Sequence, residues 1–387
     1  MTKRTALESA IINLGTLVTG AHYMDDAYEK LATHLSYLGM GMPYREGLLE
    51  ILKENMTPTE ATVLLLFPTK VAPLNPVKLD EIASQAGIPR EELEELVESL
   101  AERGWLFSGK TSDGQQGYAL QQVGFGFPQL FFWKGEDTPS ARDMATMVTK
   151  YFNRQVTEQA FSGSETKPYR YIPVRESVDQ STQAVFPYQT MEKVIEQAHT
   201  FALASCPCRM MTQFRGIGCD HPLEVCMKFD ELAQYLIDRG FGREITREEA
   251  MEVLRKSEEA GLVHFVDNAV DGIKHNCNCC GCACWNVGSI KRRKIPRDIL
   301  MATYFIRDTD EDECIACGNC VEICPVDAVT ITDNASAVDQ DWCIGCGVCI
   351  SHCPTGAAKL KQRTDKTDLP LPDFEKLHQN ILKEKHG

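Results

Sequence analysis

The sequence of 387 residues predicts an α+β protein with several domains, and three observations lead to this prediction. All 17 cysteines lie between Cys206 and Cys353, so the first half of the chain contains none. Segments with helical periodicity dominate that half, whereas strand-like and helical segments alternate around the cysteines. An apolar content of 43% is enough to bury several cores. We therefore expect a helical N-terminal half, a mixed cysteine-rich middle domain and a small cysteine-rich C-terminal domain.

The chain shows no sign of export or of a membrane span. Its longest apolar run, Val63 to Phe67, is far shorter than the roughly 18 residues that a span needs. The N-terminus is basic, but Glu8 and Asn13 interrupt what would be the core of a signal peptide. We expect a cytoplasmic protein, with peripheral attachment to a membrane complex as the alternative. In a reducing cytosol, dense cysteine indicates metal binding rather than disulfides.

Residues 1–45 are predicted to form two amphipathic helices. Each helix has one apolar stripe at helical spacing, formed by Leu7, Ile11, Leu14 and Val18 in the first and by Ala27, Leu31, Leu35 and Leu38 in the second. Such stripes pack into a core or against another subunit, so an oligomer is compatible with the pattern.

Residues 46–135 have the pattern of a winged helix-turn-helix. Thr57 to Glu60 form a capping box with proline at the first helical position. Two further helices are expected around the turn Gly87-Ile88-Pro89, and the segments 105–107 and 118–120 would form the wing hairpin. Folds of this kind often bind DNA, which makes a redox-sensing regulator one alternative.

The charge of the third predicted helix argues against nucleic acid. Between Arg90 and Arg103 the sequence has six glutamates and only these two arginines, and the whole chain has a net charge of −15. Phosphate contacts need the opposite sign. We therefore expect no nucleic-acid partner and interpret this segment as a docking scaffold.

Residues 136–190 read as a connecting segment. A helix is expected from Thr138 to about Asn153, and an extended stretch from Pro168 to Arg175. Neither carries recognisable chemistry.

The middle domain, residues 191–290, contains nine cysteines in two groups. Cys206 and Cys208 follow a predicted helix and strand, and Cys226 is expected on a helix that continues through Leu223 and Met227. The second group consists of the five cysteines in residues 277–284. If this segment is extended, Cys277 and Cys279 face one way, and Cys280, Cys282 and Cys284 face the opposite way. We expect both groups to contribute ligands to a shared site, or the second to touch two metal centres. The nine candidates are Cys206, Cys208, Cys219, Cys226, Cys277, Cys279, Cys280, Cys282 and Cys284.

These nine cysteines predict one or two additional iron–sulfur clusters, with zinc as the alternative. The CPCR element at Cys206 to Arg209 and the CNCC run at Cys277 to Cys280 resemble those of iron–sulfur electron-transfer proteins of anaerobic bacteria. Cys279-Cys280-Gly281 is also similar to the CCG tripeptide of heterodisulfide-reductase catalytic subunits, which bind a non-cubane cluster; that resemblance implies disulfide reduction as an alternative. His221 and His275 lie nearby in sequence, and we interpret both as satisfied surface or core histidines rather than ligands.

Residues 291–306 form a basic linker that contains Lys291, Arg292, Arg293, Lys294 and Arg297. Two interpretations stay open. The patch is either a solvated linker face, or a cationic neighbour that offsets cluster charge or guides an acidic partner.

An internal repeat fills residues 307–360 and leaves 361–387 as a C-terminal tail. Asp312 to Val329 and Asp341 to Ala358 align at an offset of 29 residues with nine of 18 positions identical. Each copy reads C-x2-C-x2-C-x3-C-P, in which three closely spaced thiolates wrap one face of a cubane and the fourth leads away toward a neighbouring cluster.

This repeat closely resembles the bacterial two-cluster (2×4Fe–4S) ferredoxins. The resemblance implies a ferredoxin-like C-terminal domain with two 4Fe–4S clusters. One cluster would be held by Cys314, Cys317, Cys320 and Cys353. The other would be held by Cys343, Cys346, Cys349 and Cys324.

Together these features predict an iron–sulfur electron-transfer protein, expected to be a subunit or partner of an anaerobic oxidoreductase. Its partner would be a redox protein or a catalytic oxidoreductase subunit. The alternatives are an oxidoreductase with a catalytic, unusual cluster in residues 206–284 and a redox-sensing winged-helix regulator. No flavin, nicotinamide or nucleotide site is indicated, because the sequence contains no Rossmann fingerprint, P-loop or nucleophile elbow, and the catalytic residues stay unknown.

Overall fold

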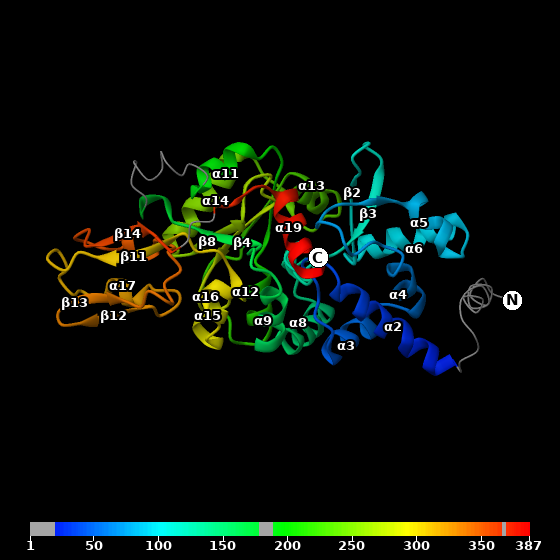
Figure 1. The fold of residues 1–387 in the computed structure, drawn as a ribbon, viewed down its shortest axis with the longest axis horizontal. Coiled ribbons are helices and arrows are strands. Elements are labelled where there is room, and N and C mark those ends of the chain that lie inside the picture. Colours follow the sequence, from blue (N-terminus) through cyan, green and yellow to red (C-terminus); the bar gives the residue numbers. More distant parts are fainter. Residues whose placement is uncertain (1–19, 178–188, 366–368) are drawn as a thin grey trace. The chain divides into compact units, whose positions relative to one another are not determined.

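The computed structural model describes residues 20–177, 189–365 and 369–387, which belong to two compact units (Figure 1). Of the described residues, 20–131 and 143–156 form the first unit, and 132–142, 157–177, 189–365 and 369–387 form the second. Helices and strands are mixed in the chain, which confirms the predicted α+β class. In the described ranges, no helix combines the length and the apolar character needed to cross a membrane.

The first unit consists mainly of helices around one small sheet. Its helices are α2 (Gly20–Ser36), α3 (Glu46–Asn55), α4 (Pro58–Leu64), α5 (Leu79–Ala86), α6 (Arg90–Glu102) and most of α8 (Pro139–Tyr151). The expected stripe on α2 is its inner face, since Ala27, Leu31 and Leu35 are buried. The stripe predicted from Leu7 to Val18 lies outside the described residues.

A hairpin completes the first unit. Strands β1 (Val77–Lys78), β2 (Leu106–Lys110) and β3 (Gln116–Leu120) form an antiparallel sheet in the order β1-β3-β2. Thr57 caps α4 as expected, because its hydroxyl accepts the N–H of Glu60 while the Glu60 carboxylate accepts the N–H of Thr57. The winged-helix interpretation of this unit stays a prediction.

The second unit is built on a six-stranded antiparallel sheet. Its strand order is β4-β8-β10-β6-β5-β7. The strands are β4 (Tyr169–Ile172), β5 (Phe201–Ser205), β6 (Glu224–Phe229), β7 (Arg243–Glu244), β8 (Val263–Asp267) and β10 (His275–Cys279).

One face of this sheet packs against helices α11 (Met191–Gln197) and α14 (Arg247–Glu259). Met227 on β6 and Ile172 on β4 belong to this apolar core, together with Val194 and Leu254 from the two helices. Because side chains alternate along a strand, the residues between these core positions point to the opposite face. That opposite face carries Cys226, one of the candidate metal ligands of the middle domain.

Cys226 lies on strand β6, so its expected helical position was wrong. The segment has no polar–apolar alternation, because β6 runs between β10 and β5 and five of its six residues are buried. A short apolar run of this kind cannot be distinguished from a buried helix by periodicity alone.

The repeat and the tail complete the second unit. The repeat forms two two-stranded sheets, β11 (Phe305–Thr309) with β14 (Ala358–Gln362), and β12 (Val329–Thr332) with β13 (Ala335–Val338). The C-terminal tail is not a loose extension. It adds β15 (Leu371–Asp373) to β9 (Ala269–Asp271) and ends in α19 (Phe374–His386), whose Leu377 and Ile381 are buried.

Candidate metal centres

The two copies of the repeat fold alike around their cysteine loops. In each copy a short helix, α17 (Asn319–Glu322) or α18 (Val348–Ser351), begins directly after a glycine in the left-handed region. Gly345 also has a positive φ of 62°, and a Cβ atom there would lie 2.0 Å from the carbonyl oxygen of Phe305. Only glycine fits at this point, so the loop can lie directly on β11.

One of the two predicted ligand sets lines a single cavity. Cys324, Cys343, Cys346 and Cys349 all contribute to its wall, which is otherwise mostly apolar. Burial raises the pKa of Cys346 well above its usual value, and the charges of the neighbouring thiols raise it further. Such a site favours a centre that neutralises several thiolates at once. These four residues fit a 4Fe–4S cluster by chemistry and by position.

The other predicted ligand set is partly exposed, and backbone N–H groups donate hydrogen bonds to its sulfurs. It consists of Cys314, Cys317, Cys320 and Cys353. Ser336 donates its backbone N–H to Sγ of Cys314 over 3.3 Å, and Ala358 donates to Sγ of Cys353 over 3.4 Å. Cys320 is buried on α17, whereas Cys317 is exposed. Hydrogen bonds of this kind stabilise the anionic form of a ligand sulfur, so this set too fits a cluster.

In the middle domain, six thiols from both cysteine groups meet on the side of the six-stranded sheet opposite to α11 and α14. Cys206 caps α12 (Pro207–Phe214), directly after β5, and Cys208 lies in the first turn of that helix. The β6–β10 pairing aligns Met227 with Asn276. The next residues, Cys226 and Cys277, therefore fall opposite each other. Each thiol influences the pKa of the next in the order Cys206, Cys208, Cys284, Cys279, Cys277, Cys226, so the six lie close together. We call this the six-thiol group.

Two buried cations accompany the six-thiol group. Lys228, only 1% exposed, interacts with the charges of Cys226 and Cys277, and Arg209 is fully buried. Burial would lower the pKa of Lys228, but the charges of Cys226 and Cys277 more than offset it, so the pKa is raised. A buried cation without a counter-charge is strongly destabilising. The two cations therefore imply that this site carries negative charge in the folded protein.

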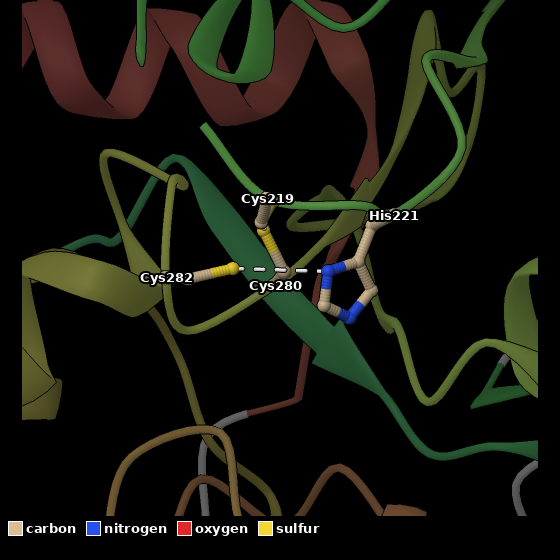
Figure 2. Close-up of side chains that lie close together, drawn as sticks. All are labelled: Cys219, His221, Cys280 and Cys282. Carbon is tan, nitrogen blue, oxygen red and sulfur yellow. Dashed lines mark hydrogen bonds between the residues drawn. The ribbon is translucent and has the colours of Figure 1, made fainter. Parts of the chain in front are cut away.

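The three remaining cysteines of the middle domain form a separate group of side chains with a histidine (Figure 2). The ligand atoms of Cys219, His221, Cys280 and Cys282 all lie within 4.8 Å of one another. Sγ of Cys219 is 3.8 Å from Sγ of Cys280, and Sγ of Cys282 is 3.8 Å from Nδ1 of His221. Figure 2 shows these side chains pointing toward one another. We call this the Cys3His group.

The five cysteines of residues 277–284 are thus divided between two sites. Cys277 and Cys279 share one face of β10 as expected, while Cys280 and Cys282 belong to the Cys3His group. Cys284 was expected with Cys280 and Cys282, but it joins the six-thiol group instead. The expected alternation holds only along the strand, and the chain turns after Cys279.

The basic residues of 291–306 are not one solvated patch. Arg292 donates to the carbonyl of Gly281 over 2.6 Å and also to that of Cys282. Arg297, 4% exposed, donates to the carbonyl of Cys343 and, over 2.5 Å, to that of Gln340. These arginines hold the backbone next to predicted ligands, and their charge lies beside the sites.

Two residues that lie beside these sites, Arg307 and Tyr171, were not predicted from the sequence. Arg307 is 2% exposed and donates to Sγ of Cys320 over 3.9 Å, while its backbone N–H donates to Sγ of Cys343 over 3.4 Å. Tyr171 on β4 is buried, and burial, then the thiols of Cys284, Cys279 and Cys346, raise its pKa well above the usual value. For Arg307 the sequence offered one signal. It precedes Ser336 by 29 residues, the offset between the two copies of the repeat, so the two residues occupy equivalent positions.

Comparison with known proteins agrees with the geometry of the repeat. Residues 305–360 match the family model of the 4Fe-4S dicluster domain. The match covers all eight cysteines of the repeat and about one seventh of the chain. No curated protein is similar enough to the chain to count as a relative. The C-terminal part of the chain is therefore a ferredoxin-like iron–sulfur region, and the chain is an iron–sulfur electron-transfer protein.

Proposed function

We propose that this chain relays electrons between two ferredoxin-type 4Fe–4S clusters and at least one further cluster in the six-thiol group. In this role it would serve as a subunit or partner of an anaerobic oxidoreductase. When bound, such clusters take up and release single electrons at low potential. The chain's own residues hold them, offset their charge and exclude water.

The observation that carries this proposal is the contact between the middle domain and the repeat. Val174, which follows β4, donates its N–H to the carbonyl of Cys346 over 2.9 Å. Gly281 packs so closely on Pro325 that a Cβ atom would lie 2.0 Å from the proline carbonyl oxygen. The middle domain and the repeat are thus in direct contact next to their thiols, an arrangement suited to electron transfer between them.

The surroundings of the six-thiol group suit a redox centre. Lys228 and Arg209 favour the more negative, reduced state of any cluster that binds there. The apolar core on the other face of the sheet keeps water away from that side. The ligand role of all 17 cysteines is part of the proposal.

Metal analysis with EPR tests it. Anaerobically purified protein should contain about 12 iron atoms and as many sulfides if the six-thiol group binds one four-iron cluster. A value of about eight would contradict the extra cluster. Cys226→Ser should remove the middle-domain signal and leave the two ferredoxin-type signals. The matched variant Cys320→Ser should remove one ferredoxin-type signal and leave the middle-domain signal.

The number of thiols favours a second candidate. Six thiols are two more than a cubane requires, which favours an unusual cluster with a catalytic role such as disulfide reduction. In that reaction a disulfide takes up two electrons and two protons and yields two thiols. The ferredoxin-type pair would supply the electrons one at a time. An EPR spectrum of an ordinary four-thiolate cubane at this site would remove the basis for this candidate.

For the first unit we propose a docking role rather than DNA binding. Glu91, Glu94 and Glu95 are exposed on α6, the helix that would have to meet phosphate. Complex formation with a redox partner should weaken as salt rises. A redox-dependent mobility shift with DNA at low salt would contradict this proposal and favour the regulator.

A further inference from the structure

We infer that the Cys3His group binds a single zinc ion, which acts as a structural clamp distinct from the electron-carrying clusters. The four residues concerned are Cys219, His221, Cys280 and Cys282. This inference reassigns three cysteines that the sequence attributed to additional clusters. It also makes His221, expected to be a satisfied histidine, a ligand.

The spacing of the ligand atoms indicates one ion. In a tetrahedral site with zinc–sulfur bonds of about 2.3 Å, neighbouring sulfurs lie about 3.8 Å apart. Cys219 and Cys280 have a Sγ–Sγ distance of 3.8 Å, and all four ligand atoms lie within 4.8 Å. In a four-iron cubane each cysteine binds a different iron atom, so the ligand sulfurs are farther apart. The Cys3His group is too compact for a cubane.

The ligand chemistry selects zinc. Three thiolates and one imidazole form one of the usual structural zinc sites, which leave no open position for a substrate. The N–H of Ala283 donates to Sγ of Cys280 over 3.4 Å, and the positive charge of Arg209 acts on this sulfur. Groups that contact a ligand sulfur in this way orient the ligand and offset the negative charge of three thiolates.

The site is separate from the six-thiol group although both use the same cysteine run. Cys280 and Cys282 follow the end of β10, and Cys219 and His221 lie on the loop between α12 and β6. The fully buried Arg209 contacts the segments of both groups, since it donates to the carbonyl of Pro222, next to His221, and to that of Asn278, between Cys277 and Cys279. A cation at this position offsets the negative charge of both sets of thiolates.

The position of the clamp suggests what it does. A bound ion would tie the loop of residues 215–223 to the turn at 280–282, across 61 residues of sequence. Gly281, between two of the ligands, packs directly on Pro325, next to the predicted cluster ligand Cys324. His221, Cys282 and Cys324 also line one surface cavity. The ion would therefore fix the middle domain where it meets the repeat, and, because zinc is redox-inert, it would carry no electrons.

Zinc analysis of the full chain tests this inference. The anaerobically purified protein should contain one zinc per chain, and zinc-edge X-ray absorption should show three sulfurs at about 2.3 Å and one nitrogen at about 2.0 Å. His221→Ala should lower the zinc content at least tenfold and leave the iron content unchanged. His221→Cys should retain zinc with four sulfur ligands, which keeps the test valid if the alanine variant folds poorly. The exposed His199→Ala is the matched control and should change neither metal.

A second readout tests the clamp itself. Amide hydrogen exchange in residues 215–223 and 280–282 should speed up at least tenfold in His221→Ala and stay unchanged in His199→Ala. Iron in place of zinc at this site, full zinc retention in His221→Ala, or unchanged exchange would overturn the inference. These results differ from a failure of the proposed function, which would appear as missing iron in a protein that still holds its zinc.

Discussion

Arg307 and Ser336 occupy equivalent positions of the repeat, and the guanidinium of Arg307 donates to the hydroxyl of Ser336 over 2.5 Å. The backbone N–H of each residue donates to the first cysteine of the other copy, Arg307 to Cys343 and Ser336 to Cys314. The two copies are thus joined crosswise through a buried cation. Because Arg307 also contacts Cys320 and lines the cavity of the other ligand set, its charge acts on both predicted clusters.

Arg307→Met should lower the reduction potentials of both ferredoxin-type clusters, because a cation favours the reduced, more negative state. At roughly 8 Å and an effective dielectric constant of about 20, the interaction is worth about 2 kcal/mol, or on the order of 90 mV for one electron. EPR-monitored redox titration measures the shift. Arg307→Lys should restore most of the potential, and Arg363→Met, which removes another buried arginine that binds Asp298 and Asp365, should leave it unchanged. Equal potentials in Arg307→Met and the natural protein would show that the charge has no such role.

Lys228→Met should lower the potential of the middle-domain cluster. The variant keeps the length of the side chain but removes the charge beside Cys226 and Cys277, so a shift on the order of 100 mV is expected from the same Coulomb arithmetic. The ferredoxin-type signals should not move. Lys274→Met, which removes a lysine paired with Glu231, is the control. A middle-domain potential that does not respond would remove the charge argument for a cluster at this site.

Gly345→Ala should abolish the cluster predicted at Cys324, Cys343, Cys346 and Cys349. The new methyl group would clash with the Phe305 carbonyl at 2.0 Å, and φ is positive, so the loop must move. Iron should fall by about four atoms per chain, the content of one cluster. Gly356→Ala is matched in conformation, with a φ of 73° but nothing within 4 Å of the added Cβ, and should keep all its iron. Equal iron in the two variants would refute the steric argument.

His378 on α19 should make the folded state less stable below neutral pH. Burial lowers its pKa to about 3, His275 and Lys385 lower it too, and Asp267 acts in the opposite direction. Between the unfolded pKa of about 6.5 and pH 3 the unfolded chain binds a proton that the folded chain does not. Stability therefore falls as pH drops through this window, by about 1.4 kcal/mol from pH 7.5 to 5.5.

The measurement is the free energy of unfolding in urea at pH 7.5 and pH 5.5. His378→Gln removes the titrating group, so its loss over this interval should be smaller than that of the natural protein by about the same 1.4 kcal/mol. Other groups titrate in both proteins and cancel in the comparison. Identical pH dependence in the two proteins would rule out His378 as the cause.

The repeat could be predicted from the sequence because its chemistry is local. Three of the four cysteines of each motif lie within seven consecutive residues, so a single short loop brings them together whatever surrounds it. The capping box at Thr57 and the hairpin around Gly114 depend on local hydrogen bonds and turn geometry in the same way. Two-cluster ferredoxin chemistry and the α+β class follow from such signals.

The grouping of the other nine cysteines was decided by the tertiary structure. Cys226 and Cys277 meet because β6 and β10 pair in one particular register, and a shift by one residue would move each thiol to the opposite face. Cys284 is separated from Cys280 and Cys282 because the chain turns after β10, and His221 approaches Cys280 through the loop between α12 and β6. The sequence by itself determined that this chain binds iron–sulfur clusters and where its repeat lies. Only the packing of strands far apart in sequence decided which thiols share a site, because register and face are set by the burial of the whole sheet rather than by the spacing of residues.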